Sequence, residues 1–294
     1  MNSRYSRQSF LGSDSQEVLA GCSVGIVGLG GGGSHIAQQL AYIGVGNITL
    51  FDPDEMDWPN LNRTVGATTL DAQKRTPKVE VAKRIIKAAN ENVSVTPLCG
   101  TWQEHFEYFR ACDIVFGCID GLLPRKMLEE TCRRALIPLI DIGMDVHLGN
   151  PYTISGQVIV SIPGEPCLRC MQFIRDTDTA EEESKYGHAG GTPQVIWPNG
   201  ALASTAVGLF MQMVTPWCRN QERSFFLGYD GNAMTFERDQ RFGLVAGVVC
   251  PHFGQDDLGD PFWTPQWQEP IEQKNPTRFD RMKKWLGALL QHRK

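Results

Sequence analysis

Short apolar runs alternate with longer segments of mixed polarity along the first 150 residues of the chain. The short runs are typical of strands buried on both faces, and the mixed segments are typical of amphipathic helices that cover a sheet. Because strands that alternate with helices pair in parallel through right-handed crossovers, the predicted fold class is α/β, with a doubly wound, Rossmann-like, mostly parallel sheet. Ser13 followed by Gln16 is a capping-box pattern for the first helix. We predict strands at 24–27, 47–52, 93–98, 113–118 and 138–142, and helices at 13–20, from the glycine cluster to Ile43, and at 77–89, 102–110 and 125–136.

The pattern changes from residue 153, where apolar segments are separated by short turns. QVIVSIP (157–163), SFFLGYD (224–230) and AMTFERD (233–239) predict antiparallel strands that extend the sheet. A polar, glycine-bearing loop at 176–192 and an apolar helix at 199–215 lie between them. We therefore expect one domain over 1–254, with halves of about 1–150 and about 151–254, and a Pro/Trp-rich tail over 255–294 that ends in a basic helix.

Composition excludes several classes of function. The net charge of -5 comes from interleaved acidic and basic residues, so no broad cationic face is expected to bind nucleic acid. No apolar run approaches the length of a membrane span. The nine cysteines are scattered except for one C-x-x-C, a usage that suits a reducing compartment, so we expect a cytoplasmic protein. Five cysteines fall in or beside predicted core elements, at 22, 99, 112, 118 and 132. We expect most of these five to be buried.

A glycine motif directly after the first strand indicates a nucleotide site. Gly28, Gly30 and Gly33 form G-x-G-x-x-G at a helix start, with Gly31 inside the motif, so backbone N–H groups can face phosphate oxygens. Asp52 ends the second strand about 20 residues later, where a carboxylate can accept hydrogen bonds from both ribose hydroxyls. The alternative is tight glycine packing without a ligand, and the motif alone does not separate a dinucleotide from ATP.

Charged residues further along the chain favour ATP. A triphosphate needs cations at its β and γ phosphates and a metal-binding carboxylate, because charge builds on the leaving pyrophosphate. Arg63 and Lys78 are candidate cations, and Asp120 follows a predicted core strand at the edge where ligands of open α/β sheets bind. Taken singly, each has an ordinary alternative, a solvated charge or a helix cap.

These segments resemble the adenylating domain of the ThiF, MoeB and HesA proteins, which is related to ubiquitin-activating enzymes. The resemblance covers roughly residues 4 to 250, and its order and spacing are specific. The matching pieces are RYSRQ at 4–8, GLGGGGS at 28–34, YIGVGNITLFDPD at 42–54, NLNR at 60–63, TPKVEVA at 76–82, GCID at 117–120 and GEPCLRC at 164–170.

The resemblance implies an enzyme that adenylates the C-terminal carboxylate of a small ubiquitin-like or sulfur-carrier protein of the β-grasp class, often ending in glycine, and that releases pyrophosphate. It implies that Asp52 holds the ribose, that Arg63 and Lys78 bind phosphate, and that Asp120 holds Mg²⁺. It adds Asp54 and Asn60 to the nucleotide contacts. It also implies a homodimer in which Arg7 reaches the partner's ATP site, and a conjugating enzyme is a further candidate partner.

Three features depart from the family pattern. Cys167 and Cys170 resemble half of the family's zinc site, but the second half reads VVCPHFG, with Phe253 where a cysteine is usual. Cys250 and His252 are the candidate completing ligands, and the alternative is a pair of half-buried thiols on a hairpin. The loop aligned with the family's crossover loop, 176–197, contains no cysteine to accept the activated carboxylate. Gly121 stands where the family commonly has Asn after the metal-binding Asp.

Other functions remain as alternatives. An NAD(P)-dependent oxidoreductase shares the glycine motif and Asp52 but gives no reason for Arg7, Arg63, Lys78 and Asp120 to stand in this order. An inactive half of a heterodimeric activating enzyme is disfavoured because the expected charged residues are present. An offshoot that acts on modified tRNA is disfavoured by the acidic pI of about 5.7 and by the C-x-x-C. The tail from 255 is expected either to dock a partner or to pack on its own domain.

Overall fold

The structure is a computed structural model of the 294-residue chain. It describes residues 3–175, 193–218, 225–245, 247–254 and 258–259, which lie within one compact unit, Met1–Thr264. The predicted loop at 176–192 and the tail, except for 258–259, lie outside the described residues, and the predicted boundary at 254 stays a prediction. No helix in these ranges has the length and apolar character that a membrane span needs.

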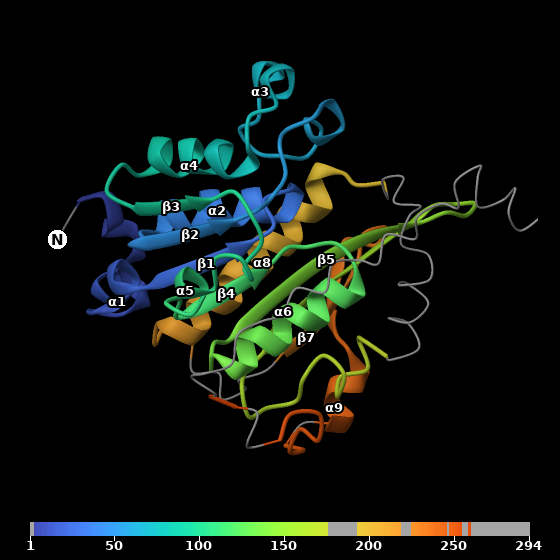
Figure 1. The fold of residues 1–294 in the computed structure, drawn as a ribbon. Coiled ribbons are helices and arrows are strands. Elements are labelled where there is room, and N and C mark those ends of the chain that lie inside the picture. The colour runs from blue at the N-terminus through green and yellow to red at the C-terminus, as the bar shows by residue number, and fades with distance from the viewer. Residues whose placement is uncertain (1–2, 176–192, 219–224, 246, 255–257, 260–294) are drawn as a thin grey trace, which may run out of the picture. The chain divides into compact units, whose positions relative to one another are not determined.

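The described residues form one eight-stranded sheet in the order β3-β2-β1-β4-β5-β6-β7-β8. The first five strands in this order are parallel, and β6, β7 and β8 extend the sheet in antiparallel register (Figure 1). The predicted doubly wound sheet with an antiparallel extension is therefore confirmed. The strands are β1 (Ser23–Val27), β2 (Asn47–Phe51), β3 (Ser94–Leu98), β4 (Ile114–Gly117), β5 (Leu139–His147), β6 (Thr153–Ser161), β7 (Phe225–Asp230) and β8 (Thr235–Arg238).

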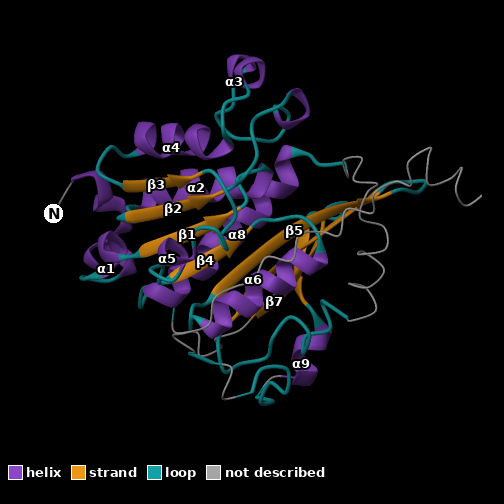
Figure 2. Cartoon of the chain, viewed as in Figure 1, coloured by secondary structure: helices purple, strands orange, loops and turns teal. Residues whose placement is uncertain are grey.

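Helices cover both faces of the sheet (Figure 2). On one face α2, α4 and α8 pack over alternate strand residues such as Ile26, Leu50 and Phe116, and on the other face α5 and α6 pack over Phe51 and Val115. The parallel strands are therefore buried on both sides, as the continuous apolar runs predict. The helices are α1 (Ser15–Gly21), α2 (Gly31–Ile43), α3 (Thr69–Lys74), α4 (Lys78–Ala89), α5 (Phe106–Phe109), α6 (Leu122–Arg134), α8 (Ile196–Val214) and α9 (Gln240–Val245), with 3-10 helices η1 (Ser3–Leu11) and η2 (Trp58–Asn60).

The start of the first helix differs from the prediction. The N-cap of α1 is Asp14, with no side-chain capping bond, so the predicted capping box from Ser13 to Gln16 is wrong. The 3-10 helix η1 brings the Leu11 carbonyl to the Ser15 hydroxyl, which donates to it at 2.7 Å, and the Gln16 amide donates to the Ile43 carbonyl at the end of α2. A hydrogen bond one turn back and a long-range bond to the end of α2 thus take the place of the predicted cap.

The predicted helix at 102–110 is shorter in the structure. Only Phe106–Phe109 is helical, because the Glu104 carboxylate accepts hydrogen bonds from the backbone N–H and hydroxyl of Thr101 and closes a turn there. The indole N–H of Trp102 donates to the Thr131 hydroxyl on α6, and this bond attaches the turn to that helix. Local side-chain bonds therefore outcompete the amphipathic pattern.

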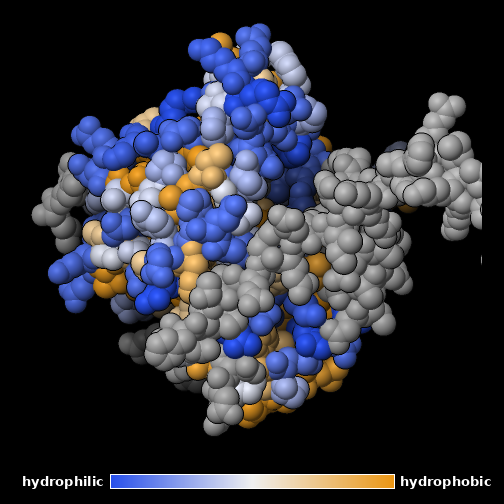
Figure 3. All heavy atoms as spheres, in the orientation of Figure 1, coloured by the Kyte–Doolittle hydropathy of each residue, from blue (hydrophilic) through white to orange (hydrophobic). Residues whose placement is uncertain are grey.

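The segment between β2 and α4 stands above the ends of the parallel strands. Its short helix α3 is capped reciprocally by Thr68 and Asp71, and Arg84 on α4 donates to both oxygens of the Asp71 carboxylate. These bonds hold the pKa of Asp71 well below its usual value. The surface over α3 is mostly hydrophilic, whereas apolar side chains gather near α9, where Leu244 and Val249 are exposed (Figure 3).

Candidate functional site

The glycine turn after β1 combines two packed glycines with one that faces open space. Gly28 has φ +87°, and a Cβ added there would lie 2.5 Å from the Cys118 carbonyl oxygen. A Cβ on Gly33 would lie 1.9 Å from the Gly28 carbonyl oxygen, whereas one on Gly30 would meet nothing within 4 Å. The helix α2 begins at Gly31, and its first hydrogen bond runs from the Ser34 N–H to the Gly30 carbonyl. The turn therefore presents a helix N-terminus with room beside Gly30 for a phosphate.

Because an added Cβ overlaps the backbone at Gly33 but meets nothing at Gly30, alanine variants of these two glycines should separate effects on folding from effects on binding. We expect Gly33→Ala to lower the free energy of unfolding by about 1–3 kcal/mol because its methyl group overlaps the backbone. We expect Gly30→Ala to keep the wild-type unfolding midpoint but to weaken ATP use by about 10- to 100-fold through displacement of the phosphates. Gly208→Ala is the control, because an added Cβ in the middle of α8 also meets nothing within 4 Å. Thermal unfolding and ATP titrations measure the two effects, and equal loss of stability in the Gly30 and Gly33 variants would contradict the assignment.

Asp52 lies directly after β2 and bonds to the glycine turn. It is 4% exposed, and its carboxylate accepts the Leu29 N–H at 2.6 Å and the Asp54 N–H at 2.8 Å. Burial raises the pKa of Asp52, against the opposing effects of the Lys78 charge and the two N–H donors. The carboxyl end of β2 thus places an acceptor beside the phosphate-facing turn, where a ribose lies in this class of sheet.

Lys78 is the first residue of α4, and its Nζ lies 2.7 Å from the Asp54 carboxylate. The lysine is largely buried, whereas the Asp54 side chain is 64% exposed. The backbone supports the pair, because the Lys78 N–H donates to the Asp54 carbonyl. Asp52, Asp54 and Lys78 therefore lie together, with the ammonium group held at the edge of the sheet.

Asp120 lies just beyond β4 at the same carboxyl edge. Its side chain is exposed and accepts a hydrogen bond from the Gln194 amide at 3.2 Å, and the Gln194 carbonyl accepts one from Asn62 at 3.0 Å. The neighbouring Arg63 donates to the Pro59 carbonyl at 2.6 Å, and Asn60 accepts the Asp57 N–H in the cap of η2. Gln194 therefore joins the loop that carries Asn60 and Arg63 to the end of β4.

Gln194 and Asn62 were not identified from the sequence. Gln194 stands between a polar loop and an apolar helix, where a single amide gives no local signal. Asn62 belongs to the NLNR segment, but its partner is 132 residues away in the chain. A contact of that range depends on how the sheet is wound, which local patterns do not encode.

Arg7 lies apart from the other candidate residues. It is exposed on η1, and the Asn90 amide at the end of α4 donates to the hydroxyl of Tyr5 on the same 3-10 helix. A Cβ on Gly44, at the end of α2, would lie 2.8 Å from Tyr5. Helices α2 and α4 end where strands β2 and β3 begin (Figure 1). The contacts of Tyr5 with these helix ends therefore put η1, which carries Arg7, at the amino ends of the strands, opposite Asp52.

Three cysteines and a histidine form a second cluster, far along the chain from the glycine turn. The candidate ligand atoms of Cys167, Cys170, Cys250 and His252 all lie within 4.8 Å of one another. Sulfur atoms are 3.6 Å apart for Cys167 and Cys170 and 3.5 Å for Cys170 and Cys250, and His252 Nδ1 is 3.3 Å from the Cys170 sulfur. These separations suit four donors around one tetrahedral ion. His252 thus supplies the fourth candidate ligand, in place of the cysteine that is usual at the position of Phe253.

The thiols of this cluster differ in their surroundings. Burial raises the pKa of Cys167 and of Cys170. Burial also acts to raise the pKa of Cys250, but hydrogen bonds from the His252 backbone and from the two other thiols lower it overall. A bound divalent cation deprotonates such thiols outright. Three cysteines and one histidine are a donor set typical of structural zinc sites, so the residues fit Zn²⁺.

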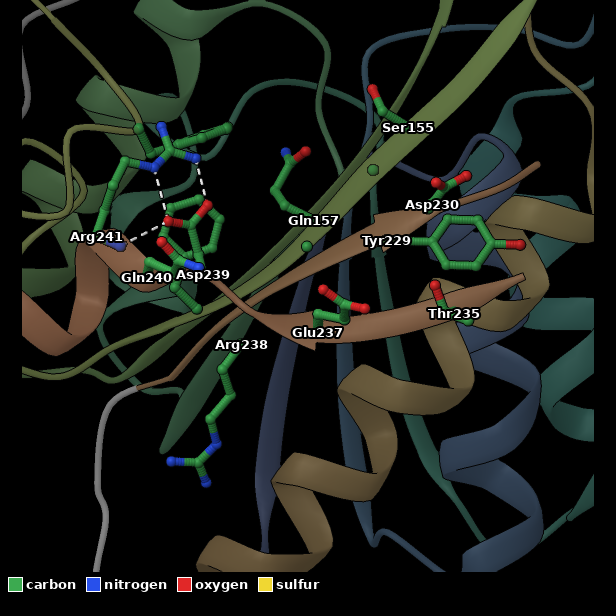
Figure 4. A pocket seen from close by; sticks show the side chains of 14 residues that line it. Ser155, Gln157, Tyr229, Asp230, Thr235, Glu237, Arg238, Asp239, Gln240 and Arg241 are labelled. Atoms are coloured by element: carbon green, nitrogen blue, oxygen red, sulfur yellow. Dashed lines mark hydrogen bonds and ion pairs between the residues drawn. The ribbon is translucent and has the colours of Figure 1, made fainter. Parts of the chain in front are cut away.

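A groove of about 690 Å³ lies on the antiparallel part of the sheet (Figure 4). Its lining comes mainly from β6, β7 and β8, where polar side chains such as Gln157 and Glu237 lie beside aromatic ones such as Tyr229. Asp230 accepts N–H groups of the turn that follows β7, and Asp239 pairs with Arg241 at 2.5 Å, so these carboxylates stabilise the hairpin and the start of α9. The residues predicted to bind nucleotide are not among those that line this groove.

Comparison with known proteins decides the family. The model of the ThiF family matches residues 3–242. The chain belongs to the ThiF family. The molybdopterin-synthase adenylyltransferase of Escherichia coli (strain K12) is 35% identical over 58% of this chain and 68% of that protein. The SAMP-activating enzyme E1 of Haloferax volcanii is 32% identical over 87% of this chain and 92% of that protein. The predicted class, an adenylyltransferase of the ThiF type, is confirmed.

Solved structures show the same fold for this ThiF-family chain. The crystal structure of E. coli MccB with ATP superposes with a TM-score of 0.63, covering 81% of this chain and 71% of MccB at 22% identity. The crystal structure of PaaA superposes with a TM-score of 0.63, covering 80% of this chain and 81% of PaaA. At this level of identity the likeness concerns the fold alone.

Proposed function

We propose that this chain uses ATP to adenylate the C-terminal carboxylate of a small ubiquitin-like or sulfur-carrier protein and releases pyrophosphate. One observation carries the proposal: within a ThiF-family domain, the open side of Gly30, the buried Asp52, the cation Lys78 and the exposed Asp120 share one edge of the sheet. The names of the relatives support the substrate class, since they include a sulfur carrier protein ThiS adenylyltransferase. An inactive half is a poorer explanation, because it gives no reason for these groups to stay together.

The residues divide the chemistry between them. The substrate carboxylate attacks the α-phosphorus, and the bond to the bridging oxygen breaks so that its electron pair leaves with pyrophosphate. We assign the ribose to Asp52, the phosphates to the glycine turn, Lys78 and Arg63, and the metal ion to Asp120. Mg²⁺ supplies positive charge at the phosphates when bound. Lys78 and Arg63 act on the same developing charge. Lys78 is held by the Asp54 carboxylate, and Arg63 is held by the Pro59 carbonyl of its own loop.

Pyrophosphate exchange into ATP tests this function directly. We expect exchange that requires Mg²⁺ and a β-grasp protein ending in glycine, and no exchange when the same protein lacks its last residue. The truncated protein is the matched control, because its folded body is unchanged. Absorbance changes with NAD(P)H in place of exchange would favour the oxidoreductase alternative.

We further propose that Cys167, Cys170, Cys250 and His252 hold a structural Zn²⁺. Three sulfur donors and one nitrogen donor within 4.8 Å of one another support this assignment, as does burial of Cys167 and Cys250. Four protein ligands leave no open position, which is the pattern of a structural site rather than a catalytic one. Metal analysis of the purified chain tests it.

A homodimer with shared sites is the proposed assembly. Arg7 lies at the amino ends of the strands, so it serves the nucleotide edge only if a second copy presents that edge to it. Beside it Phe10 is 69% exposed and Trp217 is 43% exposed, and their rings meet edge to face at 6.2 Å. Exposed aromatic residues favour an interface, which supports contact between copies here.

The remaining assignments concern location and partners. We propose a cytoplasmic location, supported by nine cysteines of which none forms a disulfide. We also propose a conjugating enzyme as a second partner, since an activated carboxylate must be passed to another group.

We predict that the enzyme's own chemistry ends at the acyl-adenylate, or that any later thioester forms on a different protein or on a cysteine outside residues 176–197, which contain none. Capture of the adenylate needs an accessible thiolate, and burial raises the pKa of Cys112, Cys118 and Cys132. The expectation that most of the five core thiols are buried is wrong: Cys112 and Cys132 are buried, Cys22 and Cys118 are half-buried, and Cys99 is exposed near the Pro53 carbonyl, just beyond β3. A non-reducing gel after incubation with ATP, Mg²⁺ and the β-grasp partner is expected to show no adduct on this chain.

The control for this gel is the same reaction treated with dithiothreitol. A band that dithiothreitol removes would overturn the adenylate-only prediction. Its loss in Cys218→Ala or in Cys99→Ala would then locate the thiol, since Cys218 is only half-buried after α8.

A further inference from the structure

A buried ion pair on α6 lies directly behind the metal-ligand cluster. Glu129 and Arg133 are each 1% exposed, and Arg133 Nε lies 3.4 Å from Glu129 Oε1, one helical turn away. Burying two charges costs several kcal/mol per ion unless further hydrogen bonds satisfy them. The additional hydrogen-bond partners of this pair therefore indicate which segment of the chain the pair stabilises.

Those partners are mostly backbone groups of the segment that carries the first two ligands. Glu129 accepts the N–H of Leu168 at 2.9 Å, and Arg133 donates to the carbonyls of Glu165 and Pro166 at 3.1 and 3.0 Å. The Ser161 hydroxyl, at the end of β6, bonds to both members of the pair. Charged side chains thus fix the backbone on each side of Cys167.

The second ligand segment contacts the same guanidinium group. The Arg133 Cζ lies 5.1 Å from the centroid of the Phe253 ring, within the range of a cation–π contact. Phe253 directly follows His252. Because His252 is the fourth candidate ligand, residue 253 is not needed as a ligand, and its aromatic ring packs on Arg133 instead. Arg133 therefore contacts both ligand segments, the one that carries Cys167 and Cys170 and the one that carries Cys250 and His252.

We propose that Glu129 and Arg133 are positioning residues for the metal centre. They hold the Cys167–Cys170 segment and the Cys250–His252 segment at the separation that one ion needs. This inference rests on the metal centre proposed above. Its physical basis is preorganisation: ligands held in place by groups that do not touch the metal bind it more tightly, and loss of such groups costs about 10- to 100-fold in affinity.

The experiment measures release of zinc from the full chain into a chromogenic chelator, with Arg133→Met and Glu129→Gln as the variants. The matched control is Arg134→Met, which breaks a second Arg–Glu pair at the same spacing on the same helix, where Glu130 is 40% exposed. We expect release to be about 10- to 100-fold faster in the two variants and unchanged in the control. The Co²⁺-substituted protein gives the ligand geometry by its thiolate charge-transfer and ligand-field bands, which a purely structural role of the pair leaves unchanged.

Phe253→Leu keeps the buried charges and removes only the ring, so it remains informative if the charge variants do not fold. Faster release in this variant supports the proposal. Release at the wild-type rate from both the Arg133 and Phe253 variants overturns it. If the wild-type chain binds neither Zn²⁺ nor Co²⁺, the metal centre and this inference both fail, while pyrophosphate exchange still tests the adenylation reaction separately.

Discussion

Replacing Asp120 with alanine is expected to lower ATP–pyrophosphate exchange by about 100- to 1000-fold while leaving the fold intact. The carboxylate is exposed at the end of β4 and bonds to the Gln194 amide. The N-cap of α6 is Gly121, so Asp120 does not cap that helix. Its loss therefore removes negative charge from the reacting edge without removing a structural bond to the helix.

Asp113→Ala is the control for this variant. Asp113 is an exposed aspartate just before the same strand, and its carboxylate accepts the Ser23 N–H at 2.8 Å at the opposite edge of the sheet. We expect Asp113→Ala to retain exchange, with any loss confined to stability. Thermal unfolding of both variants separates the two effects, and exchange within a few-fold of wild type in Asp120→Ala would remove Asp120 from the mechanism.

The sheet could be predicted from the sequence because its signals are local. Apolar runs such as VGIV at 24–27 mark strands buried on both faces, and the glycine motif marks the first crossover. The alternation with helices then determines the parallel order. The errors are equally local in origin. Ser13 and Glu104 each have the chemistry to bond to nearby backbone, but Ser13 makes no capping bond, whereas Glu104 bonds to Thr101 and delays the start of the helix to Phe106.

The candidate site was only partly predictable. Asp52, Lys78 and Asp120 follow strands or begin helices, so their place at the carboxyl edge follows from the topology. The link through Gln194 does not, because it joins residues separated by 74 and 132 positions. The role of the ion pair behind the cysteines was also beyond local patterns. Glu129 and Arg133 have the i, i+4 spacing of a solvated surface pair, and only their burial distinguishes them from Glu130 and Arg134.

Mixing two inactive variants is expected to restore activity if the sites are shared between protomers. Arg7→Ala and Lys78→Ala should each lose nearly all exchange, by about 100-fold or more, because each removes a cation from the reacting phosphates. In a mixed dimer, the site that keeps its own Lys78 also receives an intact Arg7 from the partner. Random association makes half of the dimers mixed with one working site each, so about a quarter of the wild-type activity is expected.

The structure makes this the decisive test for Arg7. The residue lies at the amino ends of the strands, and Lys78 lies with Asp54 at the other edge, so a single copy does not bring them together. If Arg7 instead acts within its own chain, every site in the mixture lacks one of the two cations and activity stays at the level of the single variants. Mixed dimers purified through two different affinity tags remove the contribution of unmixed dimers. Absence of rescue in that purified material would contradict sharing, and full activity of Arg7→Ala alone would show that Arg7 does not act at the phosphates.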